Sequence, residues 1–272
     1  MPRAAPHVTP RRSPEVAGLM YHEVTDDPKT SGFQRAGALP YTLTKTAFAR
    51  HLDAIAGGGL KPELVSELDL SAGNGTHRHV LLTFDDGGAS ALYAAEQLQQ
   101  RGWKAHFFII TGRIGERTFL KPADIKTLRD MGHVVGTHSH THPDIFRALP
   151  RELMATEWRV SRAILESLLG EPCVTASVPG GDISRIVLES AGENGIRYLF
   201  TSEPLLRPER IGDTWVFGRV ILKAGVSPAT IRQLVSFRGW QRVQLLRRLG
   251  TIARALFPPL YARYVRLRTR ER

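Results

Sequence analysis

Residues 79–88 have the sequence HVLLTFDDGG, an apolar run followed directly by two aspartates and two glycines. The apolar run is typical of a buried strand, and the Asp-Asp-Gly-Gly stretch is typical of a turn. Residues 89–101 then continue as a helix-forming segment. The stretch therefore predicts one β-loop-α unit.

The same alternation continues on both sides of this unit. We expect a strand at 17–24 and a helix that begins after Thr44 and ends at the three glycines 57–59. Further strands are expected at 105–110, 133–136, 173–178, 197–201 and 215–222, and further helices at 122–131, 151–169 and 184–193. This order predicts a parallel sheet or barrel with helices outside, in which the loops that follow the strands share one rim.

The net charge of +11 is concentrated at the C-terminal end of the chain. Residues 232–272 contain 11 arginines, no lysine and one acidic residue, Glu271, so this segment holds +10 and the remaining 231 residues are nearly neutral. A nucleic-acid partner is not expected, because such proteins usually spread basic residues over a folded face. The single cysteine, Cys173, excludes an intrachain disulfide and a cysteine-based zinc site.

These features predict a leader at 1–17 that is poorly ordered, a single domain at 18–231 and a basic helical tail at 232–272. The tail has apolar residues at helical intervals between its arginines. It is either an amphipathic helix that contacts an anionic membrane or a final helix that packs on the domain. Since no apolar run resembles a secretory signal or a membrane span, we expect a cytoplasmic protein that is at most peripheral to the inner face of the membrane.

Three polar segments follow predicted strands and should meet at the rim: His22-Glu23, Asp85-Asp86 and residues 138–142. Neighbouring side chains at the end of a strand point in opposite directions, so Asp85 and Asp86 can have different roles. The alternative is an ordinary Asp-Asp-Gly turn that caps the next helix.

Residues 138–142 have the sequence HSHTH, in which His138 and His142 are four residues apart. This spacing places both imidazoles on one side of a helical turn, whereas His140 points elsewhere and is assigned to packing or substrate contact. With one aspartate the pair forms a site for a divalent metal ion, for which zinc is the first expectation and cobalt or nickel are alternatives.

The segments TFDDG at 83–87 and HSHTH at 138–142 resemble two motifs of the polysaccharide deacetylase superfamily. The resemblance implies a distorted (β/α)7-type barrel in a single α/β domain, here with an added basic C-terminal helical segment. It also implies that Asp85 is the catalytic base and that Asp86, His138 and His142 hold the metal.

Two other motifs of the family are altered. The stretch ASVPGGD at 176–182 lacks the usual arginine and tyrosine of the third motif, so Pro179, Gly180 and Gly181 are the candidates for the oxyanion and substrate loop, and Arg219 is the candidate for positioning the base. No histidine follows His142, but MYHEV at 20–24 resembles the N-terminal motif of the permuted poly-N-acetylglucosamine deacetylases. His22 is therefore the candidate acid, and the alternative is a structural histidine at the end of a strand.

The resemblance predicts metal-dependent removal of acetyl groups from N-acetylated sugars in a polysaccharide, an oligosaccharide or a lipid-linked saccharide. Asp85 would act as base on a metal-activated water, and His22 would act as acid. Two alternatives remain: a metal-dependent amidohydrolase with a substrate that is not a sugar, and an inactive carbohydrate-binding homologue. The presence of both Asp85 and Asp86 argues against the second, because a binding protein needs no free base beside a metal ligand.

Overall fold

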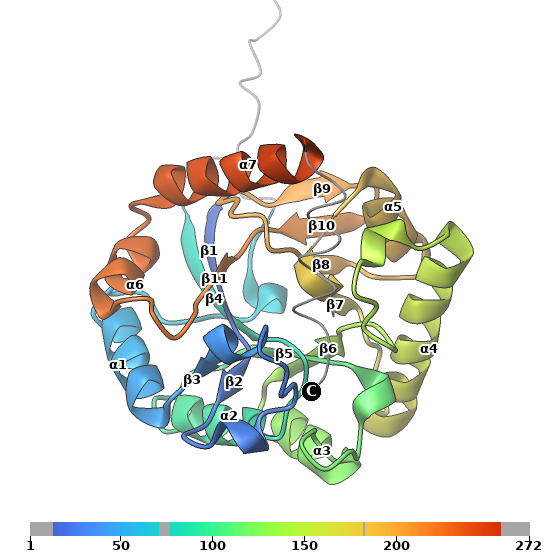
Figure 1. Ribbon diagram of the computed structural model, residues 1–272, viewed down its shortest axis with the longest axis horizontal. Helices are drawn as coiled ribbons and strands as arrows, with labels where there is room; N and C mark the ends of the chain where they lie inside the picture. Colours follow the sequence, from blue (N-terminus) through green and yellow to red (C-terminus); the bar gives the residue numbers. More distant parts are fainter. Residues whose placement is uncertain (1–12, 71–76, 182, 257–272) are drawn as a thin grey trace, which may run out of the picture.

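The computed structural model describes residues 13–70, 77–181 and 183–256, and Figure 1 shows how their helices surround a curled central sheet. Most of the predicted leader, the last part of the predicted tail and Asp182 lie outside the described residues. The described part of the chain contains no helix that is long and apolar enough to cross a membrane.

The central sheet has nine strands in the order β11-β1-β4-β5-β6-β7-β8-β10-β9. All neighbouring strands are parallel except β9 and β10, which pair in antiparallel fashion. A separate parallel pair joins β2 and β3. The strands are β1 (Glu15–Tyr21), β2 (Glu23–Val24), β3 (Thr42–Leu43), β4 (Arg78–Phe84), β5 (His106–Ile109), β6 (Val134–Thr137), β7 (Thr175–Ser177), β8 (Tyr198–Phe200), β9 (Glu209–Ile211), β10 (Thr214–Phe217) and β11 (Val220–Ile221).

Helices lie along the outer face of this sheet (Figure 1). They are α1 (Lys45–Ala56), α2 (Ala91–Gln99), α3 (Pro122–Asp130), α4 (Arg151–Leu169), α5 (Arg185–Glu193), α6 (Pro228–Val235) and α7 (Trp240–Leu256). Thr44 caps α1 as expected, because its hydroxyl accepts a hydrogen bond from the Ala47 N–H at 3.1 Å. The predicted α/β fold and distorted barrel are thus confirmed.

The alternation of side chains along β4 separates two layers of the core. Val80, Leu82 and Phe84 pack in the layer between the sheet and the helices. Leu81 belongs instead to a second cluster with Phe108, Phe200 and Phe217, on the inner face of the curled sheet. Because successive side chains of a strand point to opposite faces, Thr83 and Asp85 follow Leu81 onto this inner face.

A single stretch of chain joins the two sides of the curl. β10 pairs with β8 and β11 pairs with β1, and only Gly218 and Arg219 separate β10 from β11. We call this junction between β10 and β11, residues 218–219, the seam. It is closely packed against β1, since a Cβ atom added to Gly18 would lie 2.4 Å from the Gly218 carbonyl oxygen. Arg219 therefore enters the interior at the point where this stretch changes partners.

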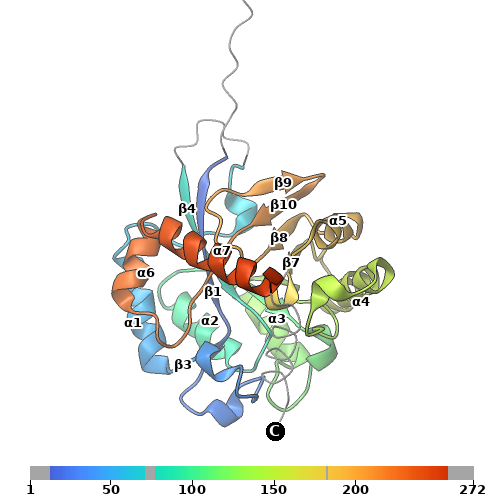
Figure 2. The same cartoon turned by 45° about the horizontal axis from the view of Figure 1, so that its top comes forward.

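The predicted division into leader, domain and tail stays a prediction, but two of its boundaries fall inside elements. β1 begins at Glu15, so the last residues of the predicted leader are part of the sheet. The boundary at 231–232 falls within α6, whose Ile231, Leu234 and Val235 are buried. α7 is described to Leu256 and lies on the outer side of the sheet, in front of the strands in the view of Figure 2.

Candidate active site

The ends of four parallel strands surround one cavity of about 240 Å³. The residues that follow β1, β4, β6 and β7 all contribute to it, as expected for a shared rim. Its walls include most of the candidates from the sequence, namely His22, Asp85, Asp86, His138, His142, Gly180 and Gly181. The aromatic side chains of Phe33 and Tyr41 complete one wall.

Asp86, His138 and His142 form a group that could hold a metal ion, since one ligand atom of each lies within 4.8 Å of the others. The Oδ1 atom of Asp86 is 3.5 Å from Nε2 of His138 and 3.8 Å from Nε2 of His142. Ligands about 2.1 Å from a tetrahedral zinc ion lie roughly 3.4 Å apart. Two imidazoles and one carboxylate are also a donor set of hydrolytic zinc sites, so the geometry and the chemistry fit such an ion.

Hydrogen bonds orient the two histidines. Nδ1 of His138 donates to the Ser177 carbonyl oxygen at 2.9 Å, which leaves Nε2 directed at Asp86. The backbone N–H of His142 donates to Oγ of Ser139 at 3.1 Å. The second ring nitrogen of metal-binding histidines is usually held in this way, so the contact of His138 supports a role as ligand.

The loop that carries the histidines is not the helical turn that their spacing suggested. Ser139 and His142 have positive φ angles of 65° and 56°, and Asp86 on the opposite side has a φ of 79°. Such values are unfavourable for residues with a side chain, and they often occur at functional sites. The two imidazoles therefore converge through a left-handed backbone. His140 points elsewhere, with Nδ1 3.0 Å from Oγ1 of Thr111.

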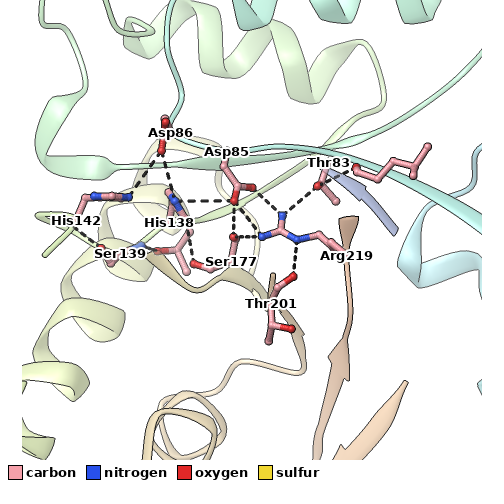
Figure 3. A network of polar contacts seen from close by, with 11 residues as sticks. Thr83, Asp85, Asp86, His138, Ser139, His142, Ser177, Thr201 and Arg219 are labelled. Carbon is pink, nitrogen blue, oxygen red and sulfur yellow. Dashed lines mark hydrogen bonds and ion pairs between the residues drawn. The ribbon is translucent and has the colours of Figure 1, made fainter. Parts of the chain in front are cut away.

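Asp85 lies beside this group and is held by Arg219 (Figure 3). Nη1 of Arg219 donates to Oδ1 at 2.8 Å, and Nη2 donates to Oδ2 at 3.0 Å. Ser177 adds a hydrogen bond from its hydroxyl to Oδ2 at 2.8 Å. The guanidinium is itself fixed by Oγ1 of Thr83 and the carbonyl oxygen of Thr201, both at 3.0 Å.

The charges of this network shift the pKa values of its members. Burial alone would raise the pKa of Asp85, but Arg219 and His138 outweigh it and hold that pKa below its usual value. The pKa of Asp86 is also lowered, because hydrogen bonding to His138 and the nearby histidines outweigh burial. Burial and His138 lower the pKa of His142 to about 4. Both carboxylates are therefore charged and His142 is neutral near pH 7, the forms that bind metals.

His22 follows β1 and lines the cavity, where its ring centroid lies 4.9 Å from that of Tyr41. Burial lowers its pKa, and the charges of Asp86 and Asp85 oppose this effect. Its Nδ1 atom is buried and has no hydrogen-bond partner within the described part of the chain. The position is thus compatible with the predicted acid, and the role stays a prediction.

Pro179–Gly181 forms a short 3-10 turn after β7 in which both glycines have positive φ angles. Gly180 and Gly181 line the cavity, and Pro179 is buried without lining it. The N–H of Gly181 donates a hydrogen bond to the Val178 carbonyl oxygen at 2.9 Å. This N–H therefore already has a hydrogen-bond acceptor within the turn. A Cβ atom on Gly181 would lie 1.7 Å from Oγ of Ser202, which explains why glycine is needed there.

Sequence reasoning missed Ser177, and it placed Glu23 at the rim without assigning it a role. Ser177 contacts both Asp85 and His138, and the signal for it was its place in the altered third motif. Glu23 is 3% exposed and lines the cavity, and its carboxylate accepts hydrogen bonds from the Gly32 N–H at 2.8 Å and from the Ser90 hydroxyl at 2.5 Å. Its burial depends on loops that only the folded chain brings together.

Comparison with known proteins connects this geometry to a family. Residues 72–199 match the family model described as polysaccharide deacetylase. The peptidoglycan-N-acetylglucosamine deacetylase PgdA of Listeria monocytogenes is 28% identical over 119 residues, which are 43% of this chain and 24% of the relative. The chain thus spans only about a quarter of the length of this curated relative.

Two solved structures share the fold. IcaB from Ammonifex degensii aligns with a TM-score of 0.68 and 23% identity, over 84% of this chain and 100% of that protein. A polysaccharide deacetylase from Bacillus cereus aligns with a TM-score of 0.69 and 18% identity, over 82% of this chain and 69% of that protein. At these identities the likeness concerns the architecture of the curled sheet and its helices.

Proposed function

Because the chain carries a polysaccharide deacetylase domain over residues 72–199, we propose that it hydrolyses the N-acetyl group of an N-acetylated sugar in a glycan. One observation carries the proposal: a charged carboxylate, Asp85, shares a cavity with a metal-binding group to which it does not belong. A protein that only binds glycans has no use for this second carboxylate.

Asp86, His138 and His142 would hold one divalent ion, with zinc as the expected ion and cobalt or nickel as alternatives. When bound, such an ion supplies a Lewis acid that polarises the acetamide carbonyl and lowers the pKa of water. Asp86 and His138 are buried and the His142 side chain is only 11% exposed, which favours a tightly held ion over a loosely associated one.

Asp85 would accept the proton of the attacking water. Arg219 and Ser177 hold both carboxylate oxygens in place, so the base is oriented before the substrate arrives. The same contacts keep its pKa below the usual value and the group ionised. The third-motif arginine that the sequence lacks is thus matched by Arg219, which comes from the seam between β10 and β11. This contact supports an active enzyme over an inactive homologue.

The remaining candidates take the other two steps. The turn Pro179–Gly181 would face the acetamide oxygen, where a backbone N–H can stabilise developing negative charge. His22 would donate a proton to the departing amine of the sugar. The aromatic rings of Phe33 and Tyr41 on one wall suit a sugar face, which favours a glycan over a small amide.

The Asp85→Asn variant tests the proposal, with acetate release from chitotriose as the readout. We expect the rate to fall by about 10²–10⁴-fold while the metal content is unchanged, because the base is lost and the ligands stay. Asp213→Asn is the matched control, since its side chain is fully exposed, at 100%. Loss of metal in Asp85→Asn would show that the roles of the two aspartates are exchanged. A normal rate would remove Asp85 from the mechanism.

We also propose that α7 contacts an anionic membrane surface and so keeps the protein at the inner face of the membrane. One face of the helix packs on the domain through Trp240, which is 2% exposed, and through Arg247, which binds Glu203 at 2.8 Å. Leu245, Leu246 and Leu249 are 59%, 60% and 54% exposed on another face. Arg242 and Arg248 are exposed as well, so apolar and basic side chains lie together there.

A further inference from the structure

A second hollow of about 220 Å³ lies beside the catalytic cavity, and Arg35 lines both. Arg113 and Arg117 also line it, together with Glu116 and Phe119. We call this feature the arginine hollow, defined by Arg35, Arg113 and Arg117. It has no part in the steps described above.

Aromatic rings hold two of these arginines in place. The guanidinium of Arg35 lies 4.5 Å from the ring centroid of Phe33, and that of Arg113 lies 5.4 Å from the same ring. Phe33 also lies near His142, at 5.5 Å between ring centroids, and near Phe119, at 5.6 Å. Phe33 is therefore close both to the metal-binding group and to the guanidiniums. A guanidinium stacked on a ring keeps the donors along its edge available for a ligand.

The carboxylates that pair with two arginines of the hollow, Arg35 and Arg113, are about half exposed. Arg113 pairs with Glu116 at 3.0 Å, and Arg35 lies 3.7 Å from Asp144, whose side chain is 52% exposed. The Arg35 side chain is only 18% exposed, and its 3.7 Å contact with Asp144 is a weak ion pair for a largely buried cation. An anion bound in the hollow would give the Arg35 guanidinium a closer hydrogen-bond acceptor and a counter-charge.

We propose that the arginine hollow binds an acidic group, a carboxylate or a phosphate, on the glycan whose N-acetylated sugar occupies the catalytic cavity. The inference rests on the proposed function and specifies its substrate class as an acidic glycan. Guanidinium groups bind both anions through paired hydrogen bonds, which adds geometric selectivity to charge attraction. Because Arg35 borders both spaces, the acidic group would lie on the reacting sugar or its immediate neighbour.

Two sets of probes separate binding from turnover. Cellotriose, its 6-phosphorylated derivative and its C6-carboxylated derivative contain no acetyl group, so calorimetry with the metal-loaded protein measures binding alone. The corresponding three chitotriose compounds report kcat/KM for acetate release. In the unchanged protein we expect at least one acidic derivative to be favoured about tenfold over the neutral compound at low salt, and less so at high salt. The acidic derivative with the larger preference shows whether the hollow favours a carboxylate or a phosphate.

The variants Arg35→Gln and Arg117→Gln should each reduce this preference by several-fold. Arg50→Gln is the matched control, because Arg50 is exposed on α1, outside both spaces, and should keep the preference. Equal affinity for acidic and neutral probes in the unchanged protein would overturn the inference, whether or not acetate is released. Acidic preference in calorimetry without any acetate release would instead overturn the proposed function and leave the hollow as a binding site.

Discussion

At the scale of single residues, the site depends on keeping a buried carboxylate charged. Asp85 is 3% exposed, and water contributes little to stabilising its charge. Arg219, Ser177 and His138 replace that hydration with fixed hydrogen bonds and a nearby positive charge. A base prepared in this way needs no rearrangement when substrate binds. The cost is that removal of either partner alone leaves a buried charge without its counter-charge and lowers stability.

We predict that Arg219→Met destabilises the protein by about 3–5 kcal/mol, because it leaves the buried charge of Asp85 without a partner. Acetate release should be lost as well. Urea unfolding in the presence of a chelator measures the first effect without a contribution from metal binding. The double variant Arg219→Met/Asp85→Asn should recover part of the stability and none of the activity.

The control for this prediction is Arg210→Met, which removes an ion pair with Asp213 whose side chains are 57% and 100% exposed. Its effect on stability should be negligible, because exposed pairs contribute little. If Arg219→Met were as mild as Arg210→Met, the pair with Asp85 would not be the support that the contacts indicate.

A second prediction concerns Glu23, whose pKa burial raises to about 7, against a usual value of 4.5. Below pH 4.5 the group is protonated in both the folded and the unfolded chain. As the pH rises towards 7, only the unfolded chain loses the proton, so the folded state becomes less stable by up to about 3 kcal/mol. Glu23→Gln removes this term. Its free energy of unfolding relative to the unchanged protein should therefore increase between pH 4 and pH 8.

Urea unfolding at the two pH values, with chelator present, checks this expectation. Other titrating groups occur in both proteins and cancel in the difference. Glu152→Gln, at an exposed position in the first turn of α4, is the control and should show no such increase. An unchanged difference for Glu23→Gln at pH 4 and pH 8 would mean that the buried carboxylate carries its charge without cost.

Candidate site residues could be predicted from the sequence where they directly follow a strand, because the loops after parallel strands share one rim. Asp85, Asp86, His138 and His142 follow apolar strands of a β-loop-α alternation, which brings them to one edge. The left-handed backbone at Ser139 and His142 could not be predicted, because contacts across the site stabilise it. The contacts of Ser177 and the burial of Glu23 likewise depend on segments that are far apart in the sequence.

At the scale of elements, the seam between β10 and β11 explains how a distant arginine reaches the base. A pattern of apolar residues predicts one strand at 215–222, and the structure divides it at Gly218 and Arg219 into two strands with different partners. The close approach of Gly18 to Gly218 brings β1 against this point. Strand pairing is a property of the whole sheet, so the division was not visible in local sequence, and neither was the antiparallel strand β9.

α7 packs on the domain, which is one of the two alternatives that its sequence allowed, and its contact with a membrane stays a proposal. It is packed through Trp240 and Arg247, and it also presents exposed leucines beside arginines. Truncation before Trp240 would remove a buried side chain, so substitution is the cleaner test of membrane contact. We predict that replacing Leu245, Leu246 and Leu249 with glutamine abolishes sedimentation with anionic vesicles, because both apolar insertion and charge attraction are needed.

Leu60, Leu153 and Ile186 provide the matched control, since they are 37%, 52% and 48% exposed and lie outside α7. Their replacement with glutamine should leave sedimentation unchanged. Neutral vesicles should bind the unchanged protein weakly. Equal sedimentation of all three proteins would place the membrane contact elsewhere or exclude it.

At the scale of the whole molecule, the fold brings together segments that are far apart in the chain. The curled sheet gathers the ends of β1, β4, β6 and β7 around one cavity, and the loop that carries Phe33 and Arg35 connects that cavity to the arginine hollow. α7 lies on the outer side of the curled sheet (Figure 2). Arginines therefore lie both on this outer helix and beside the cavity.

We propose that a metal ion held by Asp86, His138 and His142 acts together with the base Asp85 to release acetate from an N-acetylated glycan. The most direct measurement follows acetate release from chitotriose while zinc is added back to chelator-treated protein. The rate should be negligible without metal, rise in proportion to added zinc and level off at about one equivalent, as a single site requires. Full activity in the metal-free protein, or no acetate at any zinc concentration, would contradict the claim.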